Sequence, residues 1–194
     1  MNYPEYVKVN DRKYKIRTDF RIALKCNNIA QDNNIGEAER ALAIIYILFE
    51  NGLDHKEDYD ELLELARKYL GCGKEVKETD ENIDMDYNED IDYIEASFMS
   101  DYHIDLTKEK MHWWKFNKLI NGLSNSEMGN CCVLNRIRNL RNYDTKDIKD
   151  AKERQKIEKA KQDVALKRYK KENNLTKEQE ESMRKLNEIL GIGG

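Results

Sequence analysis

The sequence predicts a mainly α protein: a small helical domain with an N-terminal β-hairpin and a charged helical extension at its C-terminus. Apolar residues recur at helical spacing through most of the chain, while only residues 6–16 alternate as strands do. The 194 residues include a single proline, Pro4, which suits a helical protein because proline interrupts helices. After Thr145 charged residues dominate and the apolar spacing fails. We therefore expect a core domain of residues 1–143 followed by a charged helical extension of residues 144–194.

The N-terminal hairpin is indicated by two short alternating runs, residues 6–9 and 13–16, on either side of Asn10-Asp11. Asn and Asp favour the tight turn that such a hairpin needs. A lone hairpin is only marginally stable in water, so it must pack against something. We expect it to cover the protein's own helices. The alternative is that its open edge pairs with a second chain, which would give self-association.

Three helices are expected after the hairpin. The first begins near Thr18, a good N-cap, and contains Cys26 as a small core residue. The second covers residues 36–50, where the run ALAIIYILF is apolar almost all round the helix, so we expect it to be the central buried helix. The third, residues 56–70, is amphipathic and ends at the Gly-Cys-Gly run of residues 71–73.

An acidic stretch follows. Residues 75–92 contain nine Asp or Glu residues and one basic residue, Lys77, which predicts a solvated acidic loop over residues 75–90. Part of this stretch has the ligand spacing of a calcium loop, but Glu89 stands where that loop requires a glycine in a left-handed turn. The solvated loop is the favoured interpretation, and we expect no metal site. The residues that match the calcium spacing are Asp84, Asp86, Asn88, Asp90, Asp92 and Glu95.

The stretch from Ile91 to Leu123 holds both tryptophans and predicts two consecutive helices that form the core together with residues 36–50. The second of these helices is expected to begin near Thr107, a good N-cap. Apolar side chains share one face of each helix: Ile91, Ile94, Phe98 and Tyr102 in the first, and Trp113, Phe116, Leu119, Ile120 and Leu123 in the second.

The two tryptophans are expected to differ in role. A rotation of 100° per residue places Trp113 inside the apolar face and Trp114 outside it, among Lys110 and Lys118. One interpretation is that Trp114 lies flat on its neighbours, with one of these lysines over its ring. The other is that Trp114, Lys110 and Lys118 bind a partner, because exposed tryptophans are enriched among the residues that dominate interfaces.

Fourteen residues between positions 90 and 123 carry a family resemblance: Asp90, Ile94, Ala96, Phe98, Tyr102, Ile104, Asp105, Leu106, His112, Trp113, Trp114, Phe116, Leu119 and Leu123. They resemble the gene product fifteen-like family of tailed-phage proteins. The strand pair and helix expected at the start of the chain look like that family too.

The resemblance implies a tail assembly chaperone. Such a protein binds the long helical tape measure protein, keeps it soluble and helps to recruit major tail protein subunits for the tail tube. Coating a long rod requires many copies that each bind weakly and act together. The resemblance also implies a place in the cytoplasm of the bacterial host and absence from the mature virion. The alternative is a structural virion component, such as a head–tail joining or minor tail protein.

Two further features lie in the C-terminal third. Arg136, Arg138 and Arg141 line the polar side of an expected helix, where they would contact phosphate, form a solvated face or pair with the acidic loop. A last helix, residues 177–190, is predicted after Thr176, and its apolar face suits a second partner. The partner-binding residues expected on that face are Met183, Leu186, Ile189 and Leu190.

Several functional classes find no support in the sequence. The net charge of −4 does not favour nucleic acid as a partner, and the chain has no run of 18 apolar residues that would cross a membrane. The four cysteines and three histidines form no zinc spacing. His112 lies near Glu109, but no motif for catalysis or dinucleotide binding is present. We therefore expect no enzymatic activity, no cofactor and no metal.

Overall fold

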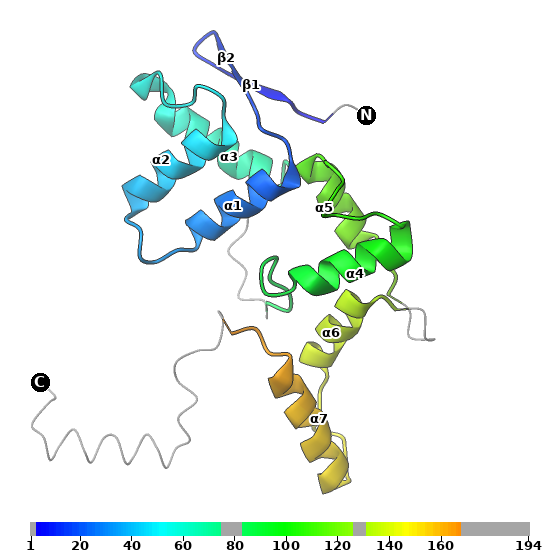
Figure 1. Ribbon diagram of the computed structural model, residues 1–194. Helices are drawn as coiled ribbons and strands as arrows, with labels where there is room; N and C mark the ends of the chain where they lie inside the picture. The colour runs from blue at the N-terminus through cyan, green and yellow to red at the C-terminus, as the bar shows by residue number, and fades with distance from the viewer. Residues whose placement is uncertain (1–2, 75–82, 126–130, 168–194) are drawn as a thin grey trace, which may run out of the picture.

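The computed structural model describes residues 3–74, 83–125 and 131–167. In these residues the protein is mainly α, with a two-stranded antiparallel sheet at its N-terminus, as predicted (Figure 1). None of the described helices is both long enough and apolar enough to cross a membrane. The elements in chain order are β1 (Tyr6–Val9), β2 (Arg12–Lys15), α1 (Phe20–Ala30), α2 (Glu37–Leu48), the 3₁₀ helix η1 (Lys56–Asp58), α3 (Tyr59–Leu70), α4 (Ile91–Tyr102), α5 (Trp113–Asn121), α6 (Val133–Asn142) and α7 (Ala151–Asp163).

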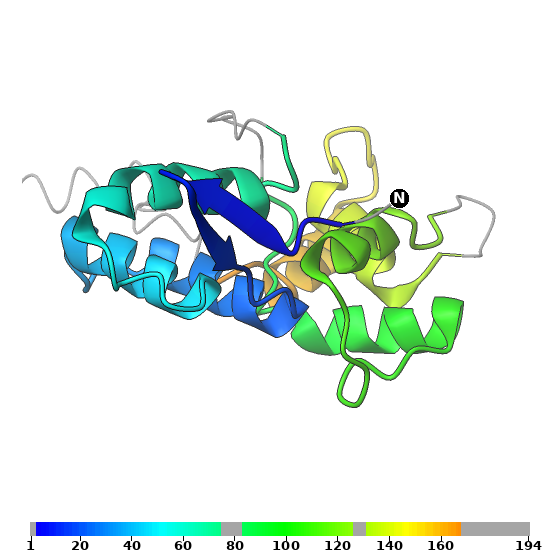
Figure 2. The ribbon, with the colours of Figure 1, turned by 90° about the horizontal axis from the view of Figure 1, so that it is seen from above.

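The hairpin packs on the protein's own helices. Asn10 and Asp11 form its turn with φ angles of 44° and 63°, the left-handed conformation that these two residue types tolerate. Val9 and Tyr14 are buried. The carboxylate of Asp58, at the end of η1, accepts hydrogen bonds from the side chains of Asn10, Arg12 and Tyr14. This buried carboxylate fixes the hairpin to the start of α3, and Figures 1 and 2 together show the strands lying over one side of the helix group α1–α3.

The helix of residues 37–48 is not the central buried helix, so that expectation is wrong. Only Ile44, Ile45 and Leu48 of α2 are buried, while Leu42 is 40% exposed and Tyr46 is 64% exposed. The helix packs against both α1 and α3, while the side that carries Leu42 and Tyr46 remains uncovered by the described residues. The helix therefore contains more apolar residues than the described fold buries.

The core is centred on Phe116 of α5, which is fully buried. Its ring stacks on Phe20 of α1 at 4.4 Å, on Phe98 of α4 at 5.3 Å and on Trp113 at 5.8 Å between ring centroids. These stacks join the helix group α1–α3 to α4 and α5. The prediction that the stretch of residues 91–123 forms the core is confirmed.

The second helix of that stretch begins at Trp113 and not near Thr107, so this detail is wrong. The backbone N–H of Phe20 donates to the carbonyl of Met111, and that of Trp113 donates to the carbonyl of Thr18. This pairing holds residues 111–113 extended beside the entry to α1, which delays the helix. His112 serves as its N-cap, because Nδ1 accepts a hydrogen bond from the backbone N–H of Trp114.

The first part of the charged extension returns to the domain. Helix α7 projects beside α6 (Figure 1), and after it Leu166 is only 7% exposed. The backbone N–H of Lys167 donates to the carboxylate of Glu89 at 2.7 Å. The domain boundary at residue 143 stays a prediction. The helix expected over residues 177–190 lies outside the described residues.

Candidate partner-binding surfaces

The two tryptophans at the start of α5 hold the end of α3. The indole N–H of Trp113 donates to the carbonyl of Leu70, and that of Trp114 donates to the carbonyl of Tyr69, both at 2.9 Å. Carbonyls in the last turn of a helix lack partners within the helix, and the indole of Trp113 supplies such a donor to Leu70. The carbonyl of Tyr69 accepts from Trp114 in addition to the backbone N–H of Cys72. The pair is therefore a structural joint between α3 and α5.

Trp113 and Trp114 differ in burial, as expected. Trp113 is 2% exposed and Trp114 is half-buried. Trp114 packs over Gly73, where a Cβ atom would lie 3.2 Å from the ring and where φ is +78°, a conformation that favours glycine. Part of the Trp114 ring remains accessible, so its role in partner binding stays a prediction.

His112 joins this surface to the N-terminal segment. Its Nε2 lies 3.1 Å from the carbonyl oxygen of Pro4, and its ring stacks on Tyr3 at 4.8 Å. Burial lowers the pKa of His112, partly opposed by the Pro4 carbonyl and by Glu5. Sequence reasoning noted His112 near Glu109 but did not connect it to residues 3–5, which lie far away in the chain.

The lysines predicted beside Trp114 are exposed, Lys110 before α5 and Lys118 on it. The ammonium group of Lys118 lies 4.9 Å from the ring centroid of Tyr3, which is within cation–π range. The result is an aromatic surface made by Tyr3, His112 and Trp114, with Lys118 at its rim. We call it the Trp114 surface; its chemistry suits an amphipathic segment that carries acidic residues. Because α5 begins at Trp113, Lys110 lies outside the helix whose rotation placed it beside Trp114, and its role in partner binding stays a prediction.

The second candidate surface is the outer face of α2, which sequence reasoning missed. Leu42 and Tyr46 lie one turn apart and are exposed, and Leu53, in the segment after α2, is 37% exposed. Large apolar side chains side by side at the surface are characteristic of protein interaction sites. A signal for this face was present, because the run ALAIIYILF carries more apolar residues than one buried stripe needs. We call it the α2 face.

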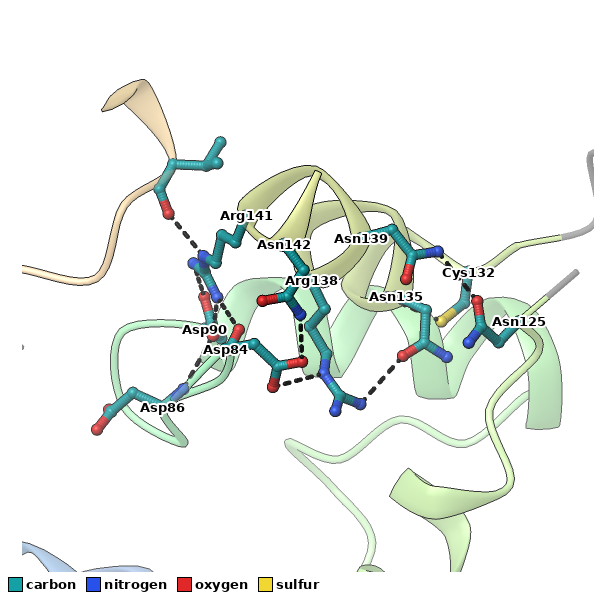
Figure 3. A network of polar contacts seen from close by, with 11 residues as sticks. Asp84, Asp86, Asp90, Asn125, Cys132, Asn135, Arg138, Asn139, Arg141 and Asn142 are labelled. Atoms are coloured by element: carbon teal, nitrogen blue, oxygen red, sulfur yellow. Dashed lines mark hydrogen bonds and ion pairs between the residues drawn. The ribbon is translucent and has the colours of Figure 1, made fainter. Parts of the chain in front are cut away.

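The acidic loop is part of neither candidate surface, because its described part is bound to α6. Asp90 is completely buried, and its two carboxylate oxygens each accept a hydrogen bond of 2.7 Å from Arg141 (Figure 3). Arg141 also donates to the backbone carbonyls of Asp84 and Val164, both at 2.7 Å. One guanidinium thereby ties the loop, α6 and the segment after α7 together.

A second arginine continues the network. Arg138 donates from Nε to the carboxylate of Asp84 at 3.1 Å, and Asn142 donates to the other oxygen of the same carboxylate (Figure 3). Asp86 is only 4% exposed and accepts from the backbone N–H of Asn88. A solvated loop is therefore the wrong description of residues 83–90. Residues 75–82 lie outside the described part.

These contacts decide between the three interpretations of the arginine cluster, which were phosphate contact, a solvated face and pairing with the acidic loop. Arg138 and Arg141 pair with the acidic loop, while Arg136 is exposed. They also occupy oxygens of Asp84 and Asp90 that the calcium spacing would require. Within the described ranges no group of three or more His, Cys, Asp or Glu side chains is placed to hold a metal ion. The absence of a tight calcium site stays a prediction.

Comparison with known proteins places the chain in a family. The family model described as "Bacteriophage Gp15 protein" matches residues 2–166. No curated protein and no solved structure matches the chain. The matched range contains both candidate surfaces and the Asp90–Arg141 network, and it ends before the helix predicted over residues 177–190.

Proposed function

Because the chain belongs to the bacteriophage Gp15 protein family, we propose that it is a tail assembly chaperone of its phage. In this role it binds the tape measure protein in the cytoplasm of the bacterial host, keeps that protein soluble and helps to recruit major tail protein subunits. It leaves before the virion is complete. Family membership supports a role connected with the phage particle, and the finer role is our proposal.

The observation that carries the proposal is the α2 face. In a chain with 37% charged residues, Leu42 and Tyr46 stand exposed and adjacent on a helix anchored from behind by Ile44, Ile45 and Leu48. An exposed apolar stripe on a rigid helix is suited to bind an amphipathic helix, whose apolar residues recur at the same spacing. The tape measure protein that the family resemblance implies is such a helical client.

The strength of one such contact is limited. Full burial of an apolar side chain contributes about 1.5–3 kcal/mol, and association costs at least about 4 kcal/mol in lost freedom of motion. Two or three side chains therefore give weak binding by a single copy. Many copies along one client bind far more tightly, because each bound neighbour raises the local concentration of the next. Weak single contacts also allow release when tail tube subunits replace the chaperone.

The Trp114 surface is the second proposed contact. Trp114 offers a ring that is already held in place by its hydrogen bond to Tyr69, so binding would cost little side-chain entropy. Lys118 adds positive charge at its rim. A client helix with acidic residues beside its apolar stripe would satisfy both surfaces.

The test is co-expression with the tape measure protein encoded by the same phage. Wild-type chain should raise the soluble fraction of that protein, and the double variant Leu42→Ser/Tyr46→Ser should return it toward the level without chaperone. The matched control is Glu64→Ser/Lys68→Ser, which changes two exposed residues one turn apart on α3 and leaves the net charge unchanged. Circular dichroism establishes that all variants are folded.

Two results would overturn the proposal. If the wild-type chain leaves the solubility of the tape measure protein unchanged, the chaperone role fails. If the chain is found in stoichiometric amount in purified virions, the alternative holds, in which it is a structural component such as a head–tail joining or minor tail protein.

A further inference from the structure

The α2 face is left uncovered by the described residues, although the sequence of α2 is that of a helix buried on most sides. We propose that residues 177–190 of the same chain dock on this face as an amphipathic helix. The proposal concerns this chain alone and does not depend on the identity of the client. It gives the apolar residues of the C-terminal segment a site within the molecule.

The apolar stripe expected on residues 177–190 corresponds in length and width to the α2 face. At 100° per residue, Met183, Leu186, Ile189 and Leu190 fall within an arc of about 120°, the width of one apolar stripe. Residues 177–190 would form a helix about 21 Å long, and the 12 residues of α2 extend about 18 Å. A helix of this length and stripe would cover Leu42 and Tyr46 together.

The connection is long enough. Lys167, the last described residue, is bound to Glu89, and the neighbouring Asn88 hydrogen-bonds with Asn28 on α1 at 2.9 Å. The chain therefore leaves the domain beside α1, and α1 packs side by side with α2 (Figure 1). Two packed helices are together about 20 Å across. The ten residue steps from Lys167 to Lys177 span up to about 33 Å, which is sufficient to bring the segment across α1 to the exposed side of α2.

The consequence for function is competition. If the α2 face also receives the client, then residues 177–190 shield that face until a client helix displaces them. Shielding would keep free copies from associating through exposed apolar residues, and displacement would release the C-terminal segment for a second partner. This consequence rests on the proposed function, whereas the docking itself does not.

The experiment is hydrogen exchange followed by mass spectrometry on the full-length chain without any client. In wild type, docking should protect amides both in residues 37–48 and in residues 177–190. Leu186→Ser/Leu190→Ser should increase exchange several-fold in both segments. The matched control Glu181→Ser/Glu188→Ser lies on the opposite face, and its loss of helix propensity is similar because Leu and Glu are similar helix formers. It should preserve the protection of residues 37–48.

The reciprocal variant completes the test. Leu42→Ser/Tyr46→Ser should abolish the protection of residues 177–190, and each measurement is repeated over a hundredfold range of protein concentration. The proposal is overturned if residues 177–190 exchange equally fast in wild type and in this variant. It is also overturned if the protection disappears on dilution together with loss of a dimer, because a second copy is then the occupant. A failure of client solubilisation alone would leave the docking result standing.

Discussion

The guanidinium of Arg141 and the carboxylate of Asp90 form a two-bond ion pair inside the protein, with both N–O distances 2.7 Å. Asp90 is completely buried and the side chain of Arg141 is 10% exposed. Buried charges of opposite sign compensate each other's loss of hydration. Removing one of them leaves the other buried without a partner, which destabilises the folded state strongly. The pair joins the start of α4 to the end of α6, two elements far apart in the chain.

Arg141→Met should therefore destabilise the protein by about 3–5 kcal/mol, measured by denaturant unfolding. The double variant Asp90→Leu/Arg141→Met should recover much of that loss, because it removes both charges. Lys15→Met is the matched control, since it breaks the exposed Lys15–Glu50 pair and should cost no more than about 1 kcal/mol. A cost for Arg141→Met as small as that of the control would contradict the assigned role of the pair.

The stability of the protein should fall as the pH is lowered through the range in which His112 titrates. Nδ1 of His112 accepts from the backbone N–H of Trp114, so the neutral ring must carry its proton on Nε2, which donates to the carbonyl of Pro4. Protonation would place a second donor against the N–H of Trp114. The pKa of His112 is lowered by burial, so the unfolded chain binds the proton more readily than the folded one.

The lowered pKa of His112 determines the direction of this pH dependence. Stability is complete above pH 6.5, the ordinary pKa of histidine, and decreases below it by at most about 1.4 kcal/mol per pH unit until the folded pKa is passed. The groups around the ring are Tyr3, Tyr69 and Trp114, which are uncharged in this range, and Glu5. Thermal unfolding between pH 7.5 and 5 measures the effect. His112→Asn keeps a capping oxygen without the titration, and curves that fall in parallel for both proteins would refute the assignment.

Asp58→Asn should loosen the hairpin. The hydrogen bond from Tyr14, helped by Asn10 and Arg12, lowers the pKa of Asp58 to about 2. The carboxylate therefore stabilises the fold fully above its ordinary pKa of 3.8, and this contribution is lost as the pH falls through about 2. Hydrogen exchange in residues 6–15 should accelerate in Asp58→Asn. Asp11→Asn changes an exposed carboxylate in the turn and should leave that exchange unaltered.

Local sequence signals predicted the hairpin and the aromatic core well. Asn10-Asp11 favours the turn by residue type. Phe98 falls on the apolar face of one predicted helix and Trp113 and Phe116 on that of the next, and all three are buried. The start of α5 was misplaced because the determining contacts, from Phe20 to Met111 and from Trp113 to Thr18, link residues that are distant in the chain. Capping preferences alone favoured Thr107.

The candidate site was less accessible to sequence reasoning. Periodicity separated Trp113 from Trp114, but it could not show that both indoles bind α3 or that Tyr3 stacks on His112. For α2 the apolar composition was read as central burial, because composition does not show how many neighbours a helix finds. The acidic loop was misjudged for the same reason, since its partners Arg138 and Arg141 follow it by about 50 residues.

The last prediction separates the two tryptophans. Trp113→Ala removes a ring that is 2% exposed and stacked on Phe116, and it should cost about 3–5 kcal/mol. Trp114→Ala removes one hydrogen bond and the contact with Gly73 from a half-buried ring, and about 2 kcal/mol is expected. Trp114→Phe keeps an aromatic ring but loses the N–H that binds Tyr69, so it should cost about 1 kcal/mol in stability.

Binding to the tape measure protein is compared at a temperature at which all variants are folded. At that temperature Trp114→Ala should weaken binding to the client. Trp114→Phe should largely retain binding, because the client would contact the aromatic ring and not the indole N–H. If Trp114→Ala destabilises as much as Trp113→Ala and leaves client binding unchanged, then Trp114 belongs to the joint between α3 and α5 and the Trp114 surface is not a binding site.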